Sequence, residues 1–253
     1  MGFDVGAESY DRFMGRYSAG MAAQMADLAG VRAGQRALDV GCGPGALTRE
    51  LVARLGPEAV AAVDPSSSFV TAARARNPGV DVRVAAAEDL PFGDHEFDAA
   101  LAQLVVHFMA DPVAGLREMA RVTRPGGAVA ACVWDHAGGQ GPLGVFWRAV
   151  HELDPAARDE SDLAGAREGH LAELFAAAQL DEIDQTLVAV DVEHPSFEEW
   201  WEPFTLGVGP AGAYVSGLAD GERDRLRELC RSLLPSPPFT VTARAWAVAG
   251  VSR

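Results

Sequence analysis

The fold of this chain is decided at residues 37–45, which read Ala-Leu-Asp-Val-Gly-Cys-Gly-Pro-Gly. A short, mostly apolar run leads into a loop with glycine at alternate positions, and residues 46–55 after the loop have the pattern of a helix. A strand, a glycine loop and a helix in this order form the ligand-binding corner of an open α/β sheet. The stretch therefore predicts a site for a nucleotide-like ligand.

The spacing of the glycines narrows the class of ligand. Gly41, Gly43 and Gly45 give G-x-G-x-G with no lysine after them, whereas dinucleotide folds use G-x-G-x-x-G and phosphate loops end in G-K-S/T. Glycine lacks a Cβ and tolerates positive φ, so the backbone can approach a ligand closely. We expect a ligand that packs on the loop but carries no pyrophosphate.

Strand and helix patterns alternate on both sides of this loop. Alternation of this kind implies a mostly parallel sheet. The predicted strands are 37–40, 59–64, 80–84, 97–102, 128–134, 186–192 and 240–248, and the predicted helices are 17–29, 46–55, 66–76, 113–121, 168–178 and 220–234. Residues 124–127 read as a sharp turn, and residues 197–218, rich in aromatics and glycine, fit neither period. We expect a doubly wound, Rossmann-like α/β sheet with an antiparallel edge strand and a small cap inserted between the late strands.

The length suits one domain with three parts. Residues 1–35 read as a helical lead-in or lid, residues 36–134 as a cofactor-binding core, and residues 135–253 as the late strands with a substrate cap around 195–235. The whole span 1–253 is therefore expected to form a single domain.

Residue counts exclude several classes of protein. The chain has 36 acidic and 21 basic side chains and a formal charge of -15, with no basic stripe, so we expect no nucleic-acid partner. Cys42, Cys132 and Cys230 are far apart and form no C-x-x-C pair, which predicts reduced thiols and no metal site. Neither a signal-peptide pattern nor a membrane-spanning run is visible, so a cytoplasmic location is expected. No heptad indicates an oligomeric state.

Five motifs in order carry a resemblance to a known family. They are residues 38–45, Asp64, residues 87–92 (Ala-Glu-Asp-Leu-Pro-Phe), Phe97-Asp98 and residues 121–127 (Arg-Val-Thr-Arg-Pro-Gly-Gly). Their order and spacing over roughly residues 8–134 resemble the class I S-adenosylmethionine-dependent methyltransferases. The type-11 small-molecule group, related to the quinone-biosynthesis C-methyltransferases, is the most similar. The lead-in at residues 10–17 also looks like the N-terminal segment of this group.

The resemblance implies a cofactor pocket made by the ends of the first two strands. The glycine loop would hold the methionine part of S-adenosylmethionine, with Asp39 accepting a hydrogen bond from its amino group. Asp64, followed by Pro65, would accept two hydrogen bonds from the ribose hydroxyls. The alternative for Asp64 is a role as the N-cap of the helix that begins near residues 66–68.

Further cofactor contacts are implied by the loops that follow. Ala87, Glu88 and Asp89 would bind adenine. Many relatives carry an acid where this chain has Ala86, so the choice between the two acids stays open, as does a plain solvated loop. Gln103 or, alternatively, the backbone of Ala102 would hold the methionine moiety.

The lead-in supplies two more predicted contacts, Arg16 and Tyr17. These side chains would close over the cofactor, with the guanidinium of Arg16 reaching the methionine carboxylate. The alternative is that they only begin a surface helix.

Two histidines lie where an acceptor would approach. His107 follows the fourth strand and His136 follows the fifth, after Asp135, and either is a candidate base. A structural role is the alternative for both. Aromatic residues outside the motifs are predicted to line a mostly apolar acceptor pocket or, alternatively, to pack the core and the cap: Phe146, Trp147, Trp200, Trp201, Phe204 and Tyr214.

The activity that the resemblance implies is in-line transfer of a methyl group to oxygen, nitrogen or carbon of a small molecule, which leaves S-adenosylhomocysteine. A base is needed only where the nucleophile must lose a proton. Two alternatives remain: a protein that binds S-adenosylmethionine without catalysis, and, against the glycine spacing, a NAD(P)-dependent oxidoreductase.

Overall fold

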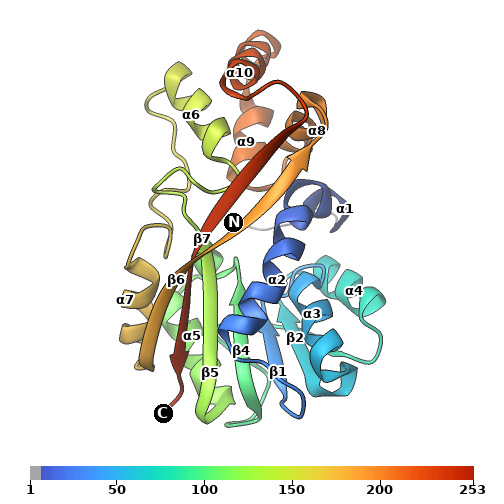
Figure 1. The fold of residues 1–253 in the computed structure, drawn as a ribbon, viewed down its shortest axis with the longest axis vertical. Helices are drawn as coiled ribbons and strands as arrows, with labels where there is room; N and C mark the ends of the chain where they lie inside the picture. The colour runs from blue at the N-terminus through green and yellow to red at the C-terminus, as the bar shows by residue number, and fades with distance from the viewer. Residues whose placement is uncertain (1–6) are drawn as a thin grey trace.

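Seven strands form one sheet in the computed structural model, which describes residues 7–253 (Figure 1). Their order is β3-β2-β1-β4-β5-β7-β6, and β7 alone runs in the direction opposite to the other six. The bounds are β1 Ala37–Val40, β2 Val60–Asp64, β3 Asp81–Val84, β4 Phe97–Gln103, β5 Thr123–Trp134, β6 Asp181–His194 and β7 Phe239–Val251. The predicted doubly wound sheet with an antiparallel strand near one edge is confirmed.

Helices cover both faces of the sheet (Figure 1). On one face α2 buries Met21 and Met25, and α3 buries Leu47 and Leu51. Each pair is four residues apart, so both members lie on the same side of the helix. The other face is covered by α5 and α7. The bounds are α2 Arg16–Leu28, α3 Ala46–Leu55, α4 Ser67–Arg76, α5 Pro112–Val122 and α7 His170–Ala177.

The strand order reverses between β1 and β4. The chain moves outward through β2 and β3 and then returns to add β4 on the other side of β1. At such a reversal the connecting segments diverge, which leaves a crevice at the carboxyl ends of the strands. The glycine loop after β1 and Gln103 at the end of β4 both lie at this edge.

A cap stands beyond the carboxyl edge of the sheet, at the far end of the long strands β6 and β7 (Figure 1). It has an aromatic core of its own, in which the rings of Phe146 and Phe204 stack with centroids 4.5 Å apart. Its elements are α6 Gly144–Leu153, α8 Phe197–Trp201, η4 Glu202–Leu206, α9 Gly209–Gly217 and α10 Asp220–Leu233. Residues 197–218, which fit neither period in the sequence, are thus short helices, and α6 joins the cap from before β6.

Two segments differ from the expected boundaries. Residues 124–127 belong to β5 and are not a separate turn, although Gly126 has a φ of 78°. Strand β6 begins at Asp181 and not at 186, because Asp184 and Gln185 pair with the end of β7. Hydrogen bonding to a long neighbour overrides the polar composition of these segments.

The remaining short elements are α1 Ala7–Tyr10, η1 Asp11–Gly15, η2 Pro57–Ala59 and η3 Val106–Phe108. Among residues 7–253, no helix is both long and apolar enough to cross a membrane.

Candidate cofactor and acceptor site

The glycine loop is tied to β2 through its backbone. The amides of Gly41 and Cys42 both donate to the carbonyl of Val63, at 2.8 and 2.9 Å. Gly41 has a φ of 70°, and a Cβ there would lie 2.3 Å from Val105. Gly43 has a φ of 53°, but a Cβ on it would have no atom within 4 Å. Gly41 is therefore required by packing, whereas Gly43 borders open space.

Asp64 is bound to this loop across the crevice. Its Oδ2 accepts the Gly43 amide at 2.9 Å and its Oδ1 accepts the Ser66 amide at 2.8 Å. Burial raises the pKa of the carboxyl group, and the two amides act in the opposite direction. The N-cap of α4 is Ser66, whose hydroxyl accepts from Phe69, so Asp64 is not the cap. Each carboxylate oxygen keeps a lone pair for a ligand hydroxyl.

Asp39 lies under the loop and not in open space. Its carboxylate is buried and accepts the hydroxyl of Thr48, on α3, at 2.6 Å. Burial raises the pKa of Asp39 to about 7, and the charge of Asp64 adds to the rise. An ammonium group bound near these two carboxylates would relieve their repulsion.

The loop after β3 presents its two acids differently. The Glu88 carboxylate accepts the backbone amide of Asp111 at 3.1 Å, which ties it to the start of α5. Asp89 is exposed, Ala87 is buried, and Pro65 on the neighbouring loop is exposed. Of the two acids, Asp89 has the carboxylate that is more accessible to a ligand.

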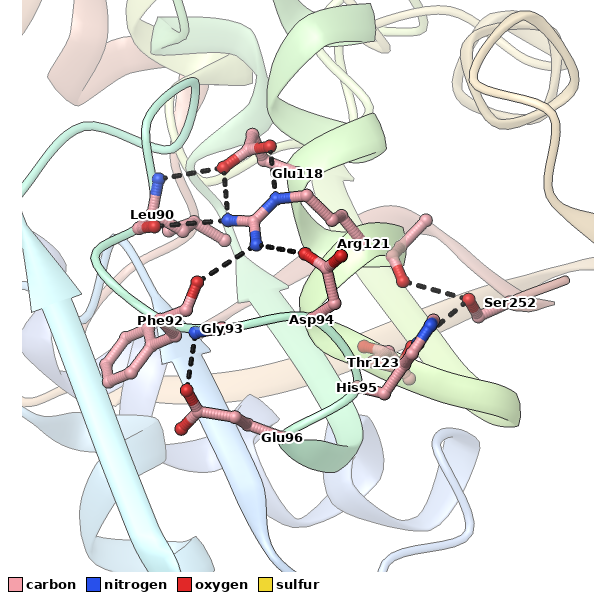
Figure 2. A network of polar contacts seen from close by, with 11 residues as sticks. Leu90, Phe92, Gly93, Asp94, His95, Glu96, Glu118, Arg121, Thr123 and Ser252 are labelled. Atoms are coloured by element: carbon pink, nitrogen blue, oxygen red, sulfur yellow. Dashed lines mark hydrogen bonds and ion pairs between the residues drawn. The ribbon is translucent and has the colours of Figure 1, made fainter.

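A polar network centred on Arg121 holds this loop in place (Figure 2). The guanidinium contacts Glu118 at 2.7 Å through both Nε and NH2, Asp94 at 2.8 Å, and the carbonyl of Phe92 at 2.9 Å. The Leu90 amide donates to Glu118 at 3.1 Å. These hydrogen bonds hold the pKa of Glu118 below its usual range. Sequence reasoning missed this network, although Arg121 opens a quoted motif and lies three residues after Glu118.

Gln103 closes the crevice on the side of β4. Its Nε2 donates to the backbone carbonyl of Ser18, in α2, at 2.9 Å. Its Oε1 is buried, and nothing within residues 7–253 donates a hydrogen bond to it. A buried acceptor of this kind needs a donor, which the amino group of a ligand would supply.

Tyr10 lies close enough to Asp64 to feel its charge, and the sequence did not single it out. Its ring packs on Phe69 with centroids 5.3 Å apart. The pKa of its hydroxyl is raised, mainly by burial and further by the nearby charge of Asp64. The residue lies within the lead-in motif at 10–17, which was the available signal.

Arg16 and Tyr17 contact the cap and do not reach the glycine loop. The guanidinium of Arg16 pairs with Glu199 on α8 and donates to the carbonyl of Glu193. The hydroxyl of Tyr17 lies 3.1 Å from Nε2 of His194, at the end of β6. The predicted contact of Arg16 with a cofactor carboxylate would therefore require this pair to open.

His107 and His136 come together, with ring centroids 5.8 Å apart. Burial lowers the pKa of His107 well below its usual value, and His136 contributes to the effect. Burial also lowers the pKa of His136 to about 4, so both rings are neutral at pH 7. Asp135 does not orient His136, because its carboxylate accepts the Gly138 amide at 2.9 Å.

The predicted apolar acceptor pocket is not where the aromatic residues lie. Phe146, Trp200, Trp201 and Phe204 are buried in the core of the cap. Trp200 and Phe204 also line a small hollow of about 20 Å³ under the lead-in. A much larger cavity, about 550 Å³, is bordered by Trp147, by Ala137 and otherwise by polar residues and glycines.

The residues at the crevice fit S-adenosylmethionine. Open space borders Gly43, lone pairs remain on Asp64, and the buried Oε1 of Gln103 needs a donor. The Asp64 carboxylate and Gln103 Oε1 accept hydrogen bonds from hydroxyl and amino groups, and neither is a phosphate-binding cation, which suits an uncharged ribose and a methionine end.

Comparison with known proteins identifies the core. Residues 38–131 match the family model described as a methyltransferase domain. Demethylmenaquinone methyltransferase of Paenarthrobacter aurescens is 32% identical over 125 residues, 49% of this chain and 47% of that protein. The enzyme of the same name from Mycobacterium sp. (strain KMS) is 43% identical over 103 residues, 41% of this chain and 43% of its own length. These alignments span less than half of each relative.

Solved structures resemble the whole fold. The YcgJ protein of Bacillus subtilis has a TM-score of 0.60 at 19% identity, covering 94% of this chain and 98% of its own. Geranyl diphosphate C-methyltransferase of Streptomyces coelicolor, crystallised with S-adenosyl-L-homocysteine, has a TM-score of 0.55 at 16% identity, covering 94% and 80%. At such identities the likeness concerns the fold alone.

Proposed function

We propose, from the premise that residues 38–131 of this chain belong to the methyltransferase-domain family, that the protein binds S-adenosylmethionine and transfers its methyl group to a small-molecule acceptor. One observation carries the proposal: Asp64 accepts the amide of Gly43 beside open space, at the edge where the strand order reverses. This arrangement supports a ribose hydroxyl on Asp64 and a backbone contact at Gly43.

The chain's own residues have binding and orienting roles in this proposal. Gln103 would accept the amino group of the methionine end, and the more accessible Asp89 would accept the adenine amine. When bound, the sulfonium supplies an activated methyl group. Because such a donor is intrinsically reactive, alignment and exclusion of water provide most of the catalysis, and positioning alone is worth about 7–11 kcal/mol in favourable cases.

His136 and His107 are the proposed bases. Both rings are neutral at pH 7 and have a nitrogen that can accept a proton, but their lowered pKa values make them weak bases, suited to an acceptor whose proton becomes acidic during attack. His136 is the better placed of the two, because it lines the 550 Å³ cavity while His107 lies behind it and is buried.

Titration calorimetry tests the proposal directly. The protein is expected to bind S-adenosylmethionine and S-adenosylhomocysteine, and Asp64→Asn is expected to weaken both at least tenfold. Asp162→Asn, an exposed change of the same charge, is the matched control and should not alter affinity. Absence of binding in a folded sample would overturn the proposal, and binding of NAD(P) instead would favour an oxidoreductase. Production of S-adenosylhomocysteine separates an enzyme from a binding protein.

A further inference from the structure

The 550 Å³ cavity lies beside the proposed transfer site. Its walls come from the loop after β5, from α6 and from residues 159–161. His136 forms part of one wall, and its ring is 5.8 Å from that of His107, which follows β4. The cavity therefore lies at the carboxyl end of β5, and His136 connects it to His107, which comes four residues after Gln103.

The charge deepest in the cavity wall is negative. Asp159 has a side chain only 19% exposed, and its Oδ1 accepts both the amide and the hydroxyl of Ser161. Its Oδ2 is 3.6 Å from His151. Arg148 and Glu152 are exposed residues of α6, four positions apart, and their opposite charges add no net charge to the lining. The carboxylate of Asp159 therefore determines whether the cavity favours a positively or a negatively charged ligand.

Two aromatic rings, those of Trp147 and His151, also line the cavity that contains the Asp159 carboxylate. The rings of Trp147 and His151 stack with centroids 6.3 Å apart and an interplanar angle of 28°. The indole N–H of Trp147 donates to the buried carboxylate of Glu160, which orients the ring. An aromatic face next to a carboxylate is a favourable environment for an organic cation. The net charge of -15 also concentrates cations near the protein.

We propose that this cavity is the acceptor site and that it takes a small organic amine, held as its ammonium ion by Asp159 and the aromatic wall. The proposal rests on the proposed function and commits the reaction to nitrogen. The ammonium releases one proton to solvent, its nitrogen lone pair forms the new bond to the methyl carbon, and the carbon–sulfur electron pair stays on sulfur. The products are the methylated amine, S-adenosylhomocysteine and a proton.

A series of matched probes tests which ligand charge the cavity prefers. Phenethylamine, 2-phenylethanol and 3-phenylpropionate share a ring and a similar length but are cationic, neutral and anionic. With S-adenosylhomocysteine present, ligand-observed NMR should show phenethylamine binding at least tenfold more tightly than the other two. Equal or tighter binding of the alcohol or the carboxylate would overturn the proposal.

Variants locate the binding. Asp159→Asn keeps an oxygen for Ser161 but removes the charge, and is expected to abolish the preference for the amine. Asp162→Asn removes the same charge from a residue outside the cavity lining and should retain the preference. If Asp159→Asn binds phenethylamine as the parent does, the site is elsewhere and the proposal is wrong.

The two proposals fail in distinguishable ways. Binding of S-adenosylhomocysteine without any preference for amines would reject the amine site alone. If the protein binds amines but does not bind S-adenosylhomocysteine, the methyltransferase function is rejected and the cavity remains an amine site. Transfer of radiolabel from S-adenosylmethionine to phenethylamine and not to 2-phenylethanol is the outcome that both proposals expect.

Discussion

Asp39 and Asp64 are close to the ends of neighbouring parallel strands, yet their carboxylates have different partners. Asp64 accepts two backbone amides at the crevice, and Asp39 accepts the Thr48 hydroxyl under the loop. Because the carboxyl ends of neighbouring parallel strands meet at one edge of the sheet, the sequence predicts the general position of both carboxylates. It does not predict their orientation, because that depends on which donors α3 and the loop bring to them.

Asp39 makes the stability of the protein depend on pH. Burial raises its folded-state pKa from 3.8 to about 7, so the folded form retains a proton that the unfolded chain releases, and this contribution to stability declines as pH rises through that window. The slope is about 1.4 kcal/mol per pH unit for one proton. Asp39→Asn is expected to flatten the dependence of Tm on pH between 4 and 7 and to raise Tm at pH 8. Equal slopes for both proteins would contradict the assignment, and Asp162→Asn is the control.

Gly41 and Gly43 separate packing from ligand binding. Gly41→Ala would place a methyl group 2.3 Å from Val105, so we expect a loss of about 2 kcal/mol or more in unfolding free energy. Gly43→Ala meets no protein atom and should cost about 1 kcal/mol from its positive φ, while weakening S-adenosylhomocysteine binding more than tenfold. Denaturant unfolding and calorimetry measure the two effects, and the reverse order would show that Gly43 does not face the ligand.

At the scale of elements, α5 acts as the anchor of the loop after β3. Arg121 and Glu118 contact each other at 2.7 Å and together bind Leu90, Phe92 and Asp94 (Figure 2). The spacing of three residues on a helix predicts the ion pair. The contacts to loop carbonyls depend on how α5 packs on β4 and β5, which local sequence does not determine.

Removing Arg121 should loosen this loop. Arg121→Gln is expected to lower the unfolding free energy by about 2 kcal/mol, because buried carbonyls and Glu118 lose their donor. S-adenosylhomocysteine binding should weaken as well, since the loop carries Asp89. Arg117→Gln on the same helix, whose side chain makes a contact with Ala177 outside the loop, is the control. A change in Tm with unchanged affinity would show that the loop does not contact the ligand.

At the scale of the whole molecule, the lead-in connects the crevice to the cap. Gln103 binds the backbone of α2, while Arg16 and Tyr17 of the same helix bind Glu199 and His194. Figure 1 shows α2 lying against the parallel strands, with α1 at its upper end. Opening of the lead-in would therefore change the crevice and the cap together.

The Arg16–Glu199 pair distinguishes two roles for the arginine. Both side chains are more than 40% exposed, so neither Arg16→Gln nor Glu199→Gln should change unfolding free energy by more than about 1 kcal/mol. If Arg16 also reaches the cofactor, Arg16→Gln will weaken S-adenosylmethionine binding while Glu199→Gln, which releases the guanidinium, will not. Equal effects of the two variants would show that Arg16 only links the lead-in to the cap.

Local patterns were sufficient for the parallel core and its ligand corner. Three features carried the prediction: the alternation of strands and helices, the G-x-G-x-G spacing and an acid at the end of the second strand. Each depends only on backbone geometry within a short segment, so a local pattern is enough to predict it. They predicted the doubly wound sheet, the loop and the position of Asp64.

The cap, the partners of Arg16 and the polar cavity required the folded chain. Residues 197–218 have no clear period because their aromatic side chains pack against α6 and α10 and not along one helix face. Asp159 and His151 face the same cavity as His136 only because α6 and the loop after β5 fold together. Such contacts join segments with no shared periodicity, so the kind of acceptor depends on packing between distant parts of the chain, whereas a corner for a nucleotide-like ligand could be predicted from residues 37–64.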